Sequence, residues 1–185
     1  MAIERQRPGK IIGTRGYTGK VISIDIDTVR FPDGSTGQLE MVRHPGASAV
    51  VPLLGDLVDD PEVLLIRQYR YAADGYLYEI PAGRLDAGEE PLACAHRELK
   101  EETGYTASRV DHLFTMFTTP GFTDEKIHLF VATGLEAGEW KREADEFMEL
   151  APIKLSRALS MIEQGEIVDA KTALALLYTA GFRLH

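Results

Sequence analysis

Cysteine is almost absent from this chain of 185 residues, and long apolar runs are absent altogether. The one cysteine, Cys94, has no second thiol in the chain to pair with, so an internal disulfide is excluded. Its place between Ala93 and Ala95 indicates packing on the small, buried face of a helix. No apolar segment approaches the roughly 20 residues of a membrane span, and none follows the basic residues near the N-terminus as in a signal peptide. These absences predict a cytoplasmic protein.

Positive charge is also scarce, because 20 Lys and Arg stand against 29 Asp and Glu, for a formal net charge of -9. Binding nucleic acid without regard to sequence needs many Lys and Arg to displace counterions from phosphates. We therefore expect no nucleic acid as partner, and the lack of a long apolar run predicts no membrane partner either. An anionic ligand would need cations to meet it. The hydrophobic fraction of 44% and the charged fraction of 26% are those of a folded globular protein.

The first 45 residues carry the pattern of a small antiparallel sheet. Residues 21–26 and 37–42 alternate apolar with polar side chains, and residues 32–35 between them supply turn-forming Pro, Asp, Gly and Ser. We predict an N-terminal hairpin or three-stranded piece. The pair Pro45 and Gly46 separates it from the next strand-like run, so we predict a β-subdomain at 1–45 and a main domain at 46–185.

The main domain mixes short strands with helices. Runs rich in apolar and β-branched residues predict strands, whereas helical spacing with terminal signals predicts helices. The predicted strands cover residues 47–54, 62–69, 77–81, 109–117, 126–133 and 148–152, and the predicted helices cover residues 90–102, 155–164 and 171–179. Because the elements alternate without regular βαβ spacing, we predict an α+β fold with a mixed sheet flanked by helices.

The helix expected at residues 90–102 concentrates acidic side chains. Glu98, Glu101 and Glu102 lie at i, i+3 and i+4, and so share an arc of about 100°. Unaided they repel one another, whereas a hard divalent cation prefers such oxygen ligands. The adjacent apolar stripe, for packing on the sheet, consists of Leu92, Ala95 and Leu99. The competing interpretation is an acidic face that only meets solvent.

The spacing around this helix resembles the Nudix box of the Nudix hydrolase family. After Gly83 come five residues, Glu89, seven residues, Arg97-Glu98-Leu99, one residue, Glu101-Glu102, one residue and Gly104. Every fixed polar and glycine position of the box is filled, and only Tyr105 replaces a more usual aliphatic residue at a packing position. The resemblance implies the Nudix fold, a mixed β-sheet sandwiched between helices in α/β/α order.

Other segments are similar to the ADP-ribose pyrophosphatase group of that family. They are residues 66–70, residues 79–83, residues 165–172 and Pro120, which comes sixteen residues after Gly104. This resemblance implies hydrolysis of ADP-ribose to AMP and ribose 5-phosphate with Mg²⁺ or Mn²⁺. It also implies that the backbone carbonyl of Ala82 and the carboxylates of Glu98 and Glu102 bind the metal, with Glu101 on a second ion or water.

The resemblance further implies a general base on a loop after the box. Glu146 is the first choice, because it precedes residues 147–150 as the group's loop carboxylate precedes its strand. Glu143 is the second choice, and Glu125 is a weaker candidate for a metal or water contact. A solvated acidic turn without a role is the competing interpretation. Arg97 is expected to pair with Glu101 or Glu89 and so to orient a carboxylate.

Substrate contacts are expected from both sides of the box. Arg67 or Arg70 could clamp a phosphate as a bidentate donor, or either could be a surface arginine. By resemblance, Glu79 lies near the nucleobase or ribose, and Pro120 with Gly121 shapes the loop that receives the terminal ribose. Members of the group are typically homodimers that exchange N-terminal β-subdomains, so a homodimer is expected here.

Two other functions stay open at this point. The same chemistry could act on another nucleoside diphosphate sugar such as GDP-mannose, because the box alone does not identify the nucleobase or the terminal sugar. A non-catalytic domain that binds a nucleotide is the other alternative, although the complete set of box glutamates argues against it.

Overall fold

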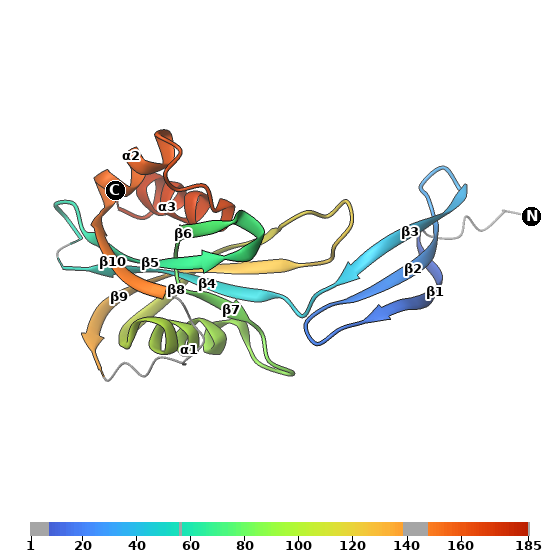
Figure 1. Ribbon diagram of the computed structural model, residues 1–185, viewed down its shortest axis with the longest axis horizontal. Helices are drawn as coiled ribbons and strands as arrows, with labels where there is room; N and C mark the ends of the chain where they lie inside the picture. The colour runs from blue at the N-terminus through green and yellow to red at the C-terminus, as the bar shows by residue number, and fades with distance from the viewer. Residues whose placement is uncertain (1–7, 56, 139–147, 185) are drawn as a thin grey trace, which may run out of the picture. The chain divides into compact units, whose positions relative to one another are not determined.

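The computed structural model describes residues 8–55, 57–138 and 148–184, which form two compact units (Figure 1). The first unit consists of the described residues up to Pro45 together with Phe117–Lys126. The second consists of Gly46–Met116 and the described residues from Ile127 on. The division into domains at 1–45 and 46–185 stays a prediction, and Phe117–Lys126 groups with the first unit although it comes from the middle of the predicted main domain.

Three antiparallel strands build the first unit in the order β1 (Gly9–Thr18), β2 (Ser23–Arg30) and β3 (Thr36–Arg43). In the turn between β2 and β3, Phe31 N donates to Ser35 O at 2.8 Å and Gly34 N donates to Phe31 O at 2.9 Å. The predicted small N-terminal antiparallel sheet is confirmed. Strand β1 precedes the alternating segments and is exposed along its whole length, so apolar–polar alternation does not reveal it.

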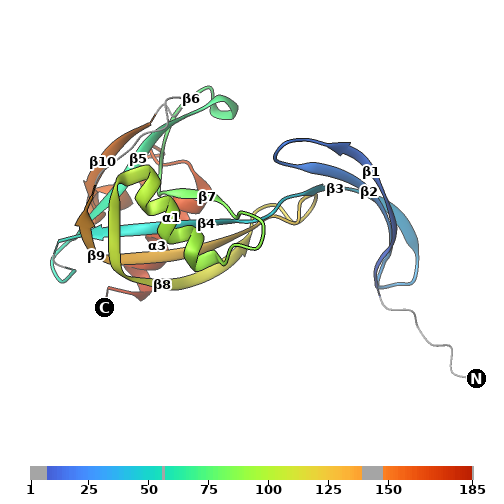
Figure 2. The same cartoon turned by 90° about the horizontal axis from the view of Figure 1, so that it is seen from below.

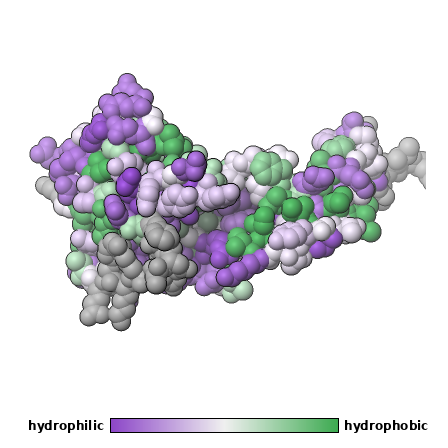
Figure 3. Space-filling model, in the orientation of Figure 1, coloured by the Kyte–Doolittle hydropathy of each residue, from purple (hydrophilic) through white to green (hydrophobic). Residues whose placement is uncertain are grey.

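Ion pairs add side-chain links between the three backbone-paired strands of the first unit. Asp25 and Asp27 lie two residues apart on one face of β2 and are largely buried. Arg43 binds both carboxylates, while Lys10 Nζ lies 2.6 Å from Asp27 Oδ1 and Arg15 Nε lies 2.5 Å from Asp25 Oδ1. Large side chains stay exposed on the same sheet: Ile11, Ile12, Tyr17, Ile26 and Leu39. Figure 3 shows hydrophobic patches in green on this part of the surface.

The second unit contains a seven-stranded mixed sheet whose main path runs β10-β5-β4-β9-β8. Strand β4 pairs in parallel with β9 and antiparallel with β5 and β7, and β5 also pairs antiparallel with β6 and β10. The strands are β4 (Ala47–Leu54), β5 (Glu62–Arg70), β6 (Gly75–Glu79), β7 (Ala82–Arg84), β8 (Tyr105–Phe117), β9 (Lys126–Ala137) and β10 (Met148–Lys154), with a 3₁₀ turn, η1, at Tyr71–Ala73.

Helices cover both faces of this sheet (Figure 2). Helix α1 (Pro91–Thr103) lies on one face, and α2 (Leu155–Glu163) and α3 (Ala170–Phe182) lie on the other. Strand β4 is buried almost throughout because alternate residues feed opposite cores: Val51 and Leu53 pack in the cluster of α2 and α3, whereas Val50 packs with Leu99 of α1. The predicted α/β/α sandwich is confirmed.

Helix α1 ends where the sequence predicts. Pro91 occupies its first turn, and Gly104, with φ at 77°, closes it by donating its N–H to Lys100 O at 2.9 Å. Of the expected apolar stripe, Ala95 and Leu99 are buried, but Leu92 is 45% exposed. The stripe is therefore shorter than predicted, since the buried face of α1 is centred on Ala95, Glu98 and Glu102, and Leu92 lies at its edge. No helix among the described residues is long and apolar enough to span a bilayer.

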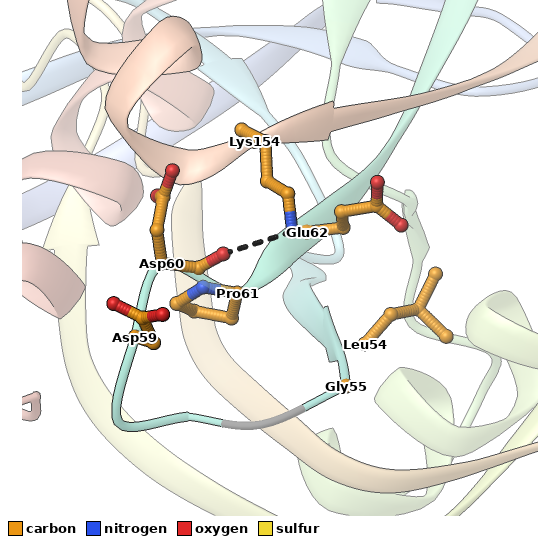
Figure 4. A pocket seen from close by; sticks show the side chains of 7 residues that line it. All are labelled: Leu54, Gly55, Asp59, Asp60, Pro61, Glu62 and Lys154. Carbon is orange, nitrogen blue, oxygen red and sulfur yellow. Dashed lines mark hydrogen bonds between the residues drawn. The ribbon is translucent and has the colours of Figure 1, made fainter.

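The loop between β4 and β5 is joined to the start of α2. Asp60, at φ 98°, accepts hydrogen bonds from Ser156 N at 2.9 Å and Ser156 Oγ at 2.8 Å, and its carbonyl accepts from Lys154 Nζ at 3.2 Å. Asp60 thus satisfies an N–H of the first turn that no residue of α2 caps. Figure 4 shows this corner, a hollow of about 450 Å³ lined by Asp59, Asp60 and Glu62 among others.

Candidate functional site

Two of the three acidic side chains predicted to converge on α1 are buried. Glu98 and Glu102, one turn apart, are 8% and 6% exposed, whereas the side chain of Glu101 is 59% exposed. The burial follows from the packing of α1 on β4, since Ala95 and Leu99 fix which side of the helix meets the sheet. The helix therefore presents a pair of carboxylates inward and a third at its rim.

The segment after β6 closes over this pair. Ala82 N donates to Glu102 Oε2 at 2.8 Å, and a Cβ built on Gly83 would lie 1.8 Å from Glu98 Oε1. Any side chain at position 83 would displace the Glu98 carboxylate, which explains physically why a glycine begins the box. Ala82, Glu98 and Glu102, three predicted metal ligands, are thus brought together.

Arg97 joins the acidic residues of the box. Its Nε and Nη2 each lie 2.9 Å from an oxygen of Glu89, and its Nη1 lies 2.5 Å from Glu98 Oε1 and 3.0 Å from Glu101 Oε2. Both expected pairs, with Glu89 and Glu101, are present, and a direct bond to Glu98 adds to them. One guanidinium therefore orients three carboxylates through charge-assisted hydrogen bonds.

Two of the carboxylates that bind Arg97, those of Glu98 and Glu89, differ in acidity. Burial raises the pKa of Glu98, although the charge and hydrogen bond of Arg97 oppose that shift. The bidentate bond from Arg97 lowers the pKa of Glu89 to about 2. Glu89 is thus a fixed anion that anchors Arg97, whereas the negative charge of Glu98 is held at a cost in stability.

Arg70 is held next to the box by Glu79, which is 2% exposed. Arg70 Nε donates to Glu79 Oε1 at 2.6 Å, and Arg70 Nη2 donates to Oε2 at 2.9 Å. Burial would raise the pKa of Glu79, but the bonds and charges of Arg70 and Lys171 outweigh it and lower that pKa. The bond to Glu79 raises the pKa of Arg70, and the charge of Glu102 adds to the effect, so Arg70 lies within electrostatic reach of α1.

Arg67 does not join the pair of Arg70 and Glu79. Arg67 and Arg70 are three residues apart on β5 and therefore point to opposite faces of the strand. The guanidinium carbon of Arg67 lies 4.5 Å from the centre of the Tyr76 ring, and Nη1 lies 3.8 Å from Glu149 Oε2. The structure thus separates two arginines that the sequence treats as equivalent.

Three other predicted site residues belong to the first unit, and two are not described. Pro120 and Gly121 belong to the first unit, in a turn closed by Phe122 N donating to Thr119 O at 3.1 Å. Glu125 lies in the same unit, 3.2 Å from His44 Nδ1. Glu143 and Glu146 lie outside the described residues. Lys171, which binds Glu79, was not predicted as a site residue, although it lies in the segment 165–172 that resembles the ADP-ribose pyrophosphatase group.

The donors of the cluster suit a hard divalent cation. Carboxylate oxygens of Glu98 and Glu102 and the backbone at Ala82 are oxygen ligands of the kind that Mg²⁺ and Mn²⁺ accept, and the close approach of Gly83 leaves no side chain between them. Among the described residues, no three His, Cys, Asp or Glu side chains already form a metal-binding group. The carbonyl of Ala82 and water or substrate oxygens would complete the coordination, as is usual for Mg²⁺.

The NUDIX domain family matches residues 43–173, which include this whole cluster. The chain belongs to the NUDIX family. Proteins of this family are hydrolases that generally need a divalent metal. The chain is therefore a NUDIX hydrolase with its box on α1.

Three curated relatives illustrate the range of named activities. The chain is 42% identical to an ADP-ribose pyrophosphatase of Bacillus subtilis (strain 168) and 40% identical to a methanol dehydrogenase activator of Bacillus methanolicus, in each case over 88% of this chain and 86% of the relative. It is 39% identical to a GDP-mannose pyrophosphatase of Cronobacter sakazakii over 74% of this chain and 78% of the relative.

A solved structure supports the fold independently. The crystal structure of an ADP compounds hydrolase superposes with a TM-score of 0.79 and covers 95% of this chain and 93% of that chain, at 22% identity. At that identity the likeness bears on the fold alone.

Replacing Glu98 by Gln should stabilise the metal-free protein near neutral pH. A carboxyl whose pKa is higher in the folded state binds more protons folded than unfolded, so its contribution to stability falls as pH rises through that pKa. We expect Glu98→Gln to unfold at a higher temperature than wild type at pH 7 in chelator, with the difference vanishing near pH 4. Glu101→Gln, at an exposed position, is the control. A lower unfolding midpoint for Glu98→Gln than for wild type at pH 7 would contradict the raised pKa of Glu98.

Proposed function

We propose that this NUDIX hydrolase cleaves the diphosphate bond of ADP-ribose, producing AMP and ribose 5-phosphate with Mg²⁺ or Mn²⁺. The observation that carries the proposal is the buried pair Glu98 and Glu102, closed by Ala82 and Gly83 in a complete box. A relative 42% identical over most of both chains is named an ADP-ribose pyrophosphatase, which supports this substrate.

Glu98, Glu102 and the carbonyl of Ala82 would hold the cation, with Glu101 at the rim for a second ion or a water. When bound, the cation supplies charge neutralisation for the diphosphate and acidifies a coordinated water. The chain itself contributes orientation. Arg97 is itself held by Glu89 and donates hydrogen bonds to Glu98 and Glu101. The N–H of Ala82 donates to one oxygen of Glu102.

Arg70 is the arginine that suits the phosphate. Its side chain is 41% exposed, and its bonds to Glu79 use Nε and Nη2, so among the described residues Nη1 is left to donate to a ligand. The charge of Glu102 adds to the raised pKa of Arg70, which supports a phosphate site formed by Arg70 together with the box carboxylates. Glu79 then contributes by holding Arg70, besides the contact with nucleobase or ribose that the resemblance suggests.

Arg67, Pro120 and Gly121 complete the proposed substrate contacts. Arg67 stacks on Tyr76, an arrangement that offers an aromatic and a cationic surface to a nucleoside. Pro120 and Gly121 would shape the turn that receives the terminal ribose.

GDP-mannose is the second candidate substrate, because a relative 39% identical is named a GDP-mannose pyrophosphatase. Both substrates present the same diphosphate to the box, so Glu98, Glu102 and Arg70 would serve either one. The nucleobase and the terminal sugar must decide between them.

Turnover on a panel of substrates tests the function. The protein is incubated with Mg²⁺ or with EDTA and one of these substrates: ADP-ribose, GDP-mannose, UDP-glucose, NADH or a diadenosine polyphosphate. A phosphatase then releases inorganic phosphate from the products, and this phosphate is measured. We expect preferential cleavage of ADP-ribose that EDTA abolishes. In Glu102→Gln we expect kcat to fall at least about 100-fold with the fold intact, since the change removes charge but little volume. Glu163→Gln, at an exposed position on α2, is the matched control.

Preference for GDP-mannose would replace the substrate and keep the mechanism. Inactivity of the wild type on every member of the panel, or activity of Glu102→Gln within about twofold of wild type, would contradict the function or the metal site respectively.

We also propose Glu146 as the general base, with Glu143 as the alternative. A base acts in the transition state, so Glu146→Gln should lower kcat more than it raises KM. Steady-state kinetics of Glu146→Gln and Glu143→Gln separate the two. If Glu143→Gln alone loses kcat, the role moves to Glu143, and if both variants keep kcat within about twofold, the base lies elsewhere.

We propose in addition that the protein is a homodimer joined through its first unit. The exposed side chains of Ile11, Ile12, Tyr17 and Leu39 on the three-stranded sheet support an apolar interface. Sedimentation velocity should show twice the mass of the chain, and Ile12→Glu should shift it to monomer. Val168→Glu, which replaces an apolar side chain 63% exposed on the second unit, should leave the dimer intact. A wild-type monomer at micromolar concentration would refute the dimer.

A further inference from the structure

The first turn of α3 makes contacts that the proposed function has not yet used. Asp169, Lys171 and Thr172, called here the α3 anchor, stand at the start of that helix. Asp169 Oδ2 caps the helix by accepting from Thr172 N at 2.9 Å and Thr172 Oγ1 at 2.6 Å, and it also lies 3.1 Å from Lys171 Nζ. The three side chains are therefore held in place by contacts with one another, in addition to their contacts with the sheet.

One arm of the α3 anchor reaches Arg70 through Glu79. Lys171 Nζ donates to Glu79 Oε2 at 2.5 Å, the same oxygen that accepts from Arg70 Nη2 at 2.9 Å. The Lys171 side chain is 13% exposed and that of Glu79 is 2% exposed, so water screens their pairing little. Two cations thus share one buried carboxylate, and Glu79 neutralises only part of the charge of Arg70.

The other arm reaches the backbone beside the box. Thr172 Oγ1, buried completely, accepts a hydrogen bond from Ile80 N at 2.9 Å. The next residue, Pro81, accepts from Val50 N at 2.9 Å, and Ala82 N donates to Glu102. Three consecutive residues are therefore tied to α3, to β4 and to α1 in turn, which fixes the peptide that carries the Ala82 carbonyl.

We propose that Lys171 is a positioning residue for the reaction, acting on substrate phosphate through Glu79 and Arg70, while Thr172 positions Ala82 through Ile80. The inference rests on the proposed function, because it concerns how the same site receives a diphosphate. Without Lys171, Arg70 is the cation that Glu79 still pairs with, and Glu79 neutralises more of the positive charge of Arg70. Arg70 therefore attracts phosphate less strongly.

A double-mutant cycle separates this role from simple support of the fold. We expect Lys171→Met to lower kcat/KM for ADP-ribose about tenfold or more and Lys171→Arg to restore most of it. In an Arg70→Met background, Lys171→Met should change kcat/KM less than about twofold, because its route to the substrate is already gone. Lys154→Met is the control, since Lys154 is a lysine at the N-cap of α2 whose Nζ binds the backbone carbonyl of Asp60 instead of Glu79.

A second measurement does not depend on turnover. Hydrogen–deuterium exchange of the metal-free protein should show faster exchange at Ile80 in Thr172→Val, with the exchange of β9 unchanged. If the double variant fails to fold, this exchange measurement and the comparison of Lys171→Met with Lys171→Arg still test the proposal.

The outcomes distinguish this inference from the proposed function. If wild type cleaves no nucleoside diphosphate sugar, the function fails and the inference falls with it. If wild type is active but Lys171→Met matches Lys154→Met, or the Lys171→Met effect is equally large with and without Arg70, the positioning role is overturned. Protection of Ile80 unaltered in Thr172→Val would overturn the second arm.

Discussion

The site depends on the close approach between the Glu98 carboxylate and the backbone of Gly83. This contact requires a residue without a Cβ, and it requires that α1 hold Glu98 against the sheet. Buried acids repel one another and lose hydration, so such a contact persists only where packing enforces it. Leu99 and Ala95 supply that packing from the same helix, and Val50 receives it from the central strand.

Strand β4 links the two sides of the second unit. Its alternate residues pack under α1 and under α2 and α3, so a hydrophobic layer on each face aligns both sets of helices with one strand. Polar contacts then connect the faces at the edge of the site: the α3 anchor holds Glu79 and Ile80, and α1 holds Ala82. The apolar cores thus set the distances at which a few buried charges meet.

Much of this arrangement follows from local sequence. The boundaries of α1 come from Pro91 and Gly104, and the bonds of Arg97 to Glu89 and Glu101 come from helical spacing and a short loop. Helix periodicity does not show that the buried face is centred on Glu98 and Glu102 as well as Ala95, so Leu92 was wrongly placed in the buried stripe. Strand β1 lacks the alternation of a half-buried strand because it is exposed throughout and joins β2 through backbone pairing and charge pairs, without an apolar face to bury.

The parts that could not be predicted depend on residues distant in the chain. Lys171 and Glu79 lie in two segments that the sequence already singled out, but only the packing of α3 on the sheet shows that their side chains pair. Likewise, strand geometry separates Arg67 from Arg70, but only the pairing of β5 with β6 determines which of them meets Glu79. The roles of Glu143 and Glu146 stay predictions from resemblance.

The central claim is that Glu98, Glu102 and the Ala82 carbonyl form one cation site, and anomalous diffraction from crystals grown with Mn²⁺ tests it most directly. The account predicts an anomalous peak within direct coordination distance of an oxygen from each of these three residues, about 2.0–2.4 Å. A Mn²⁺ ion bound elsewhere, with Glu98 still paired to Arg97 and Glu102 still accepting from Ala82 N, would contradict it.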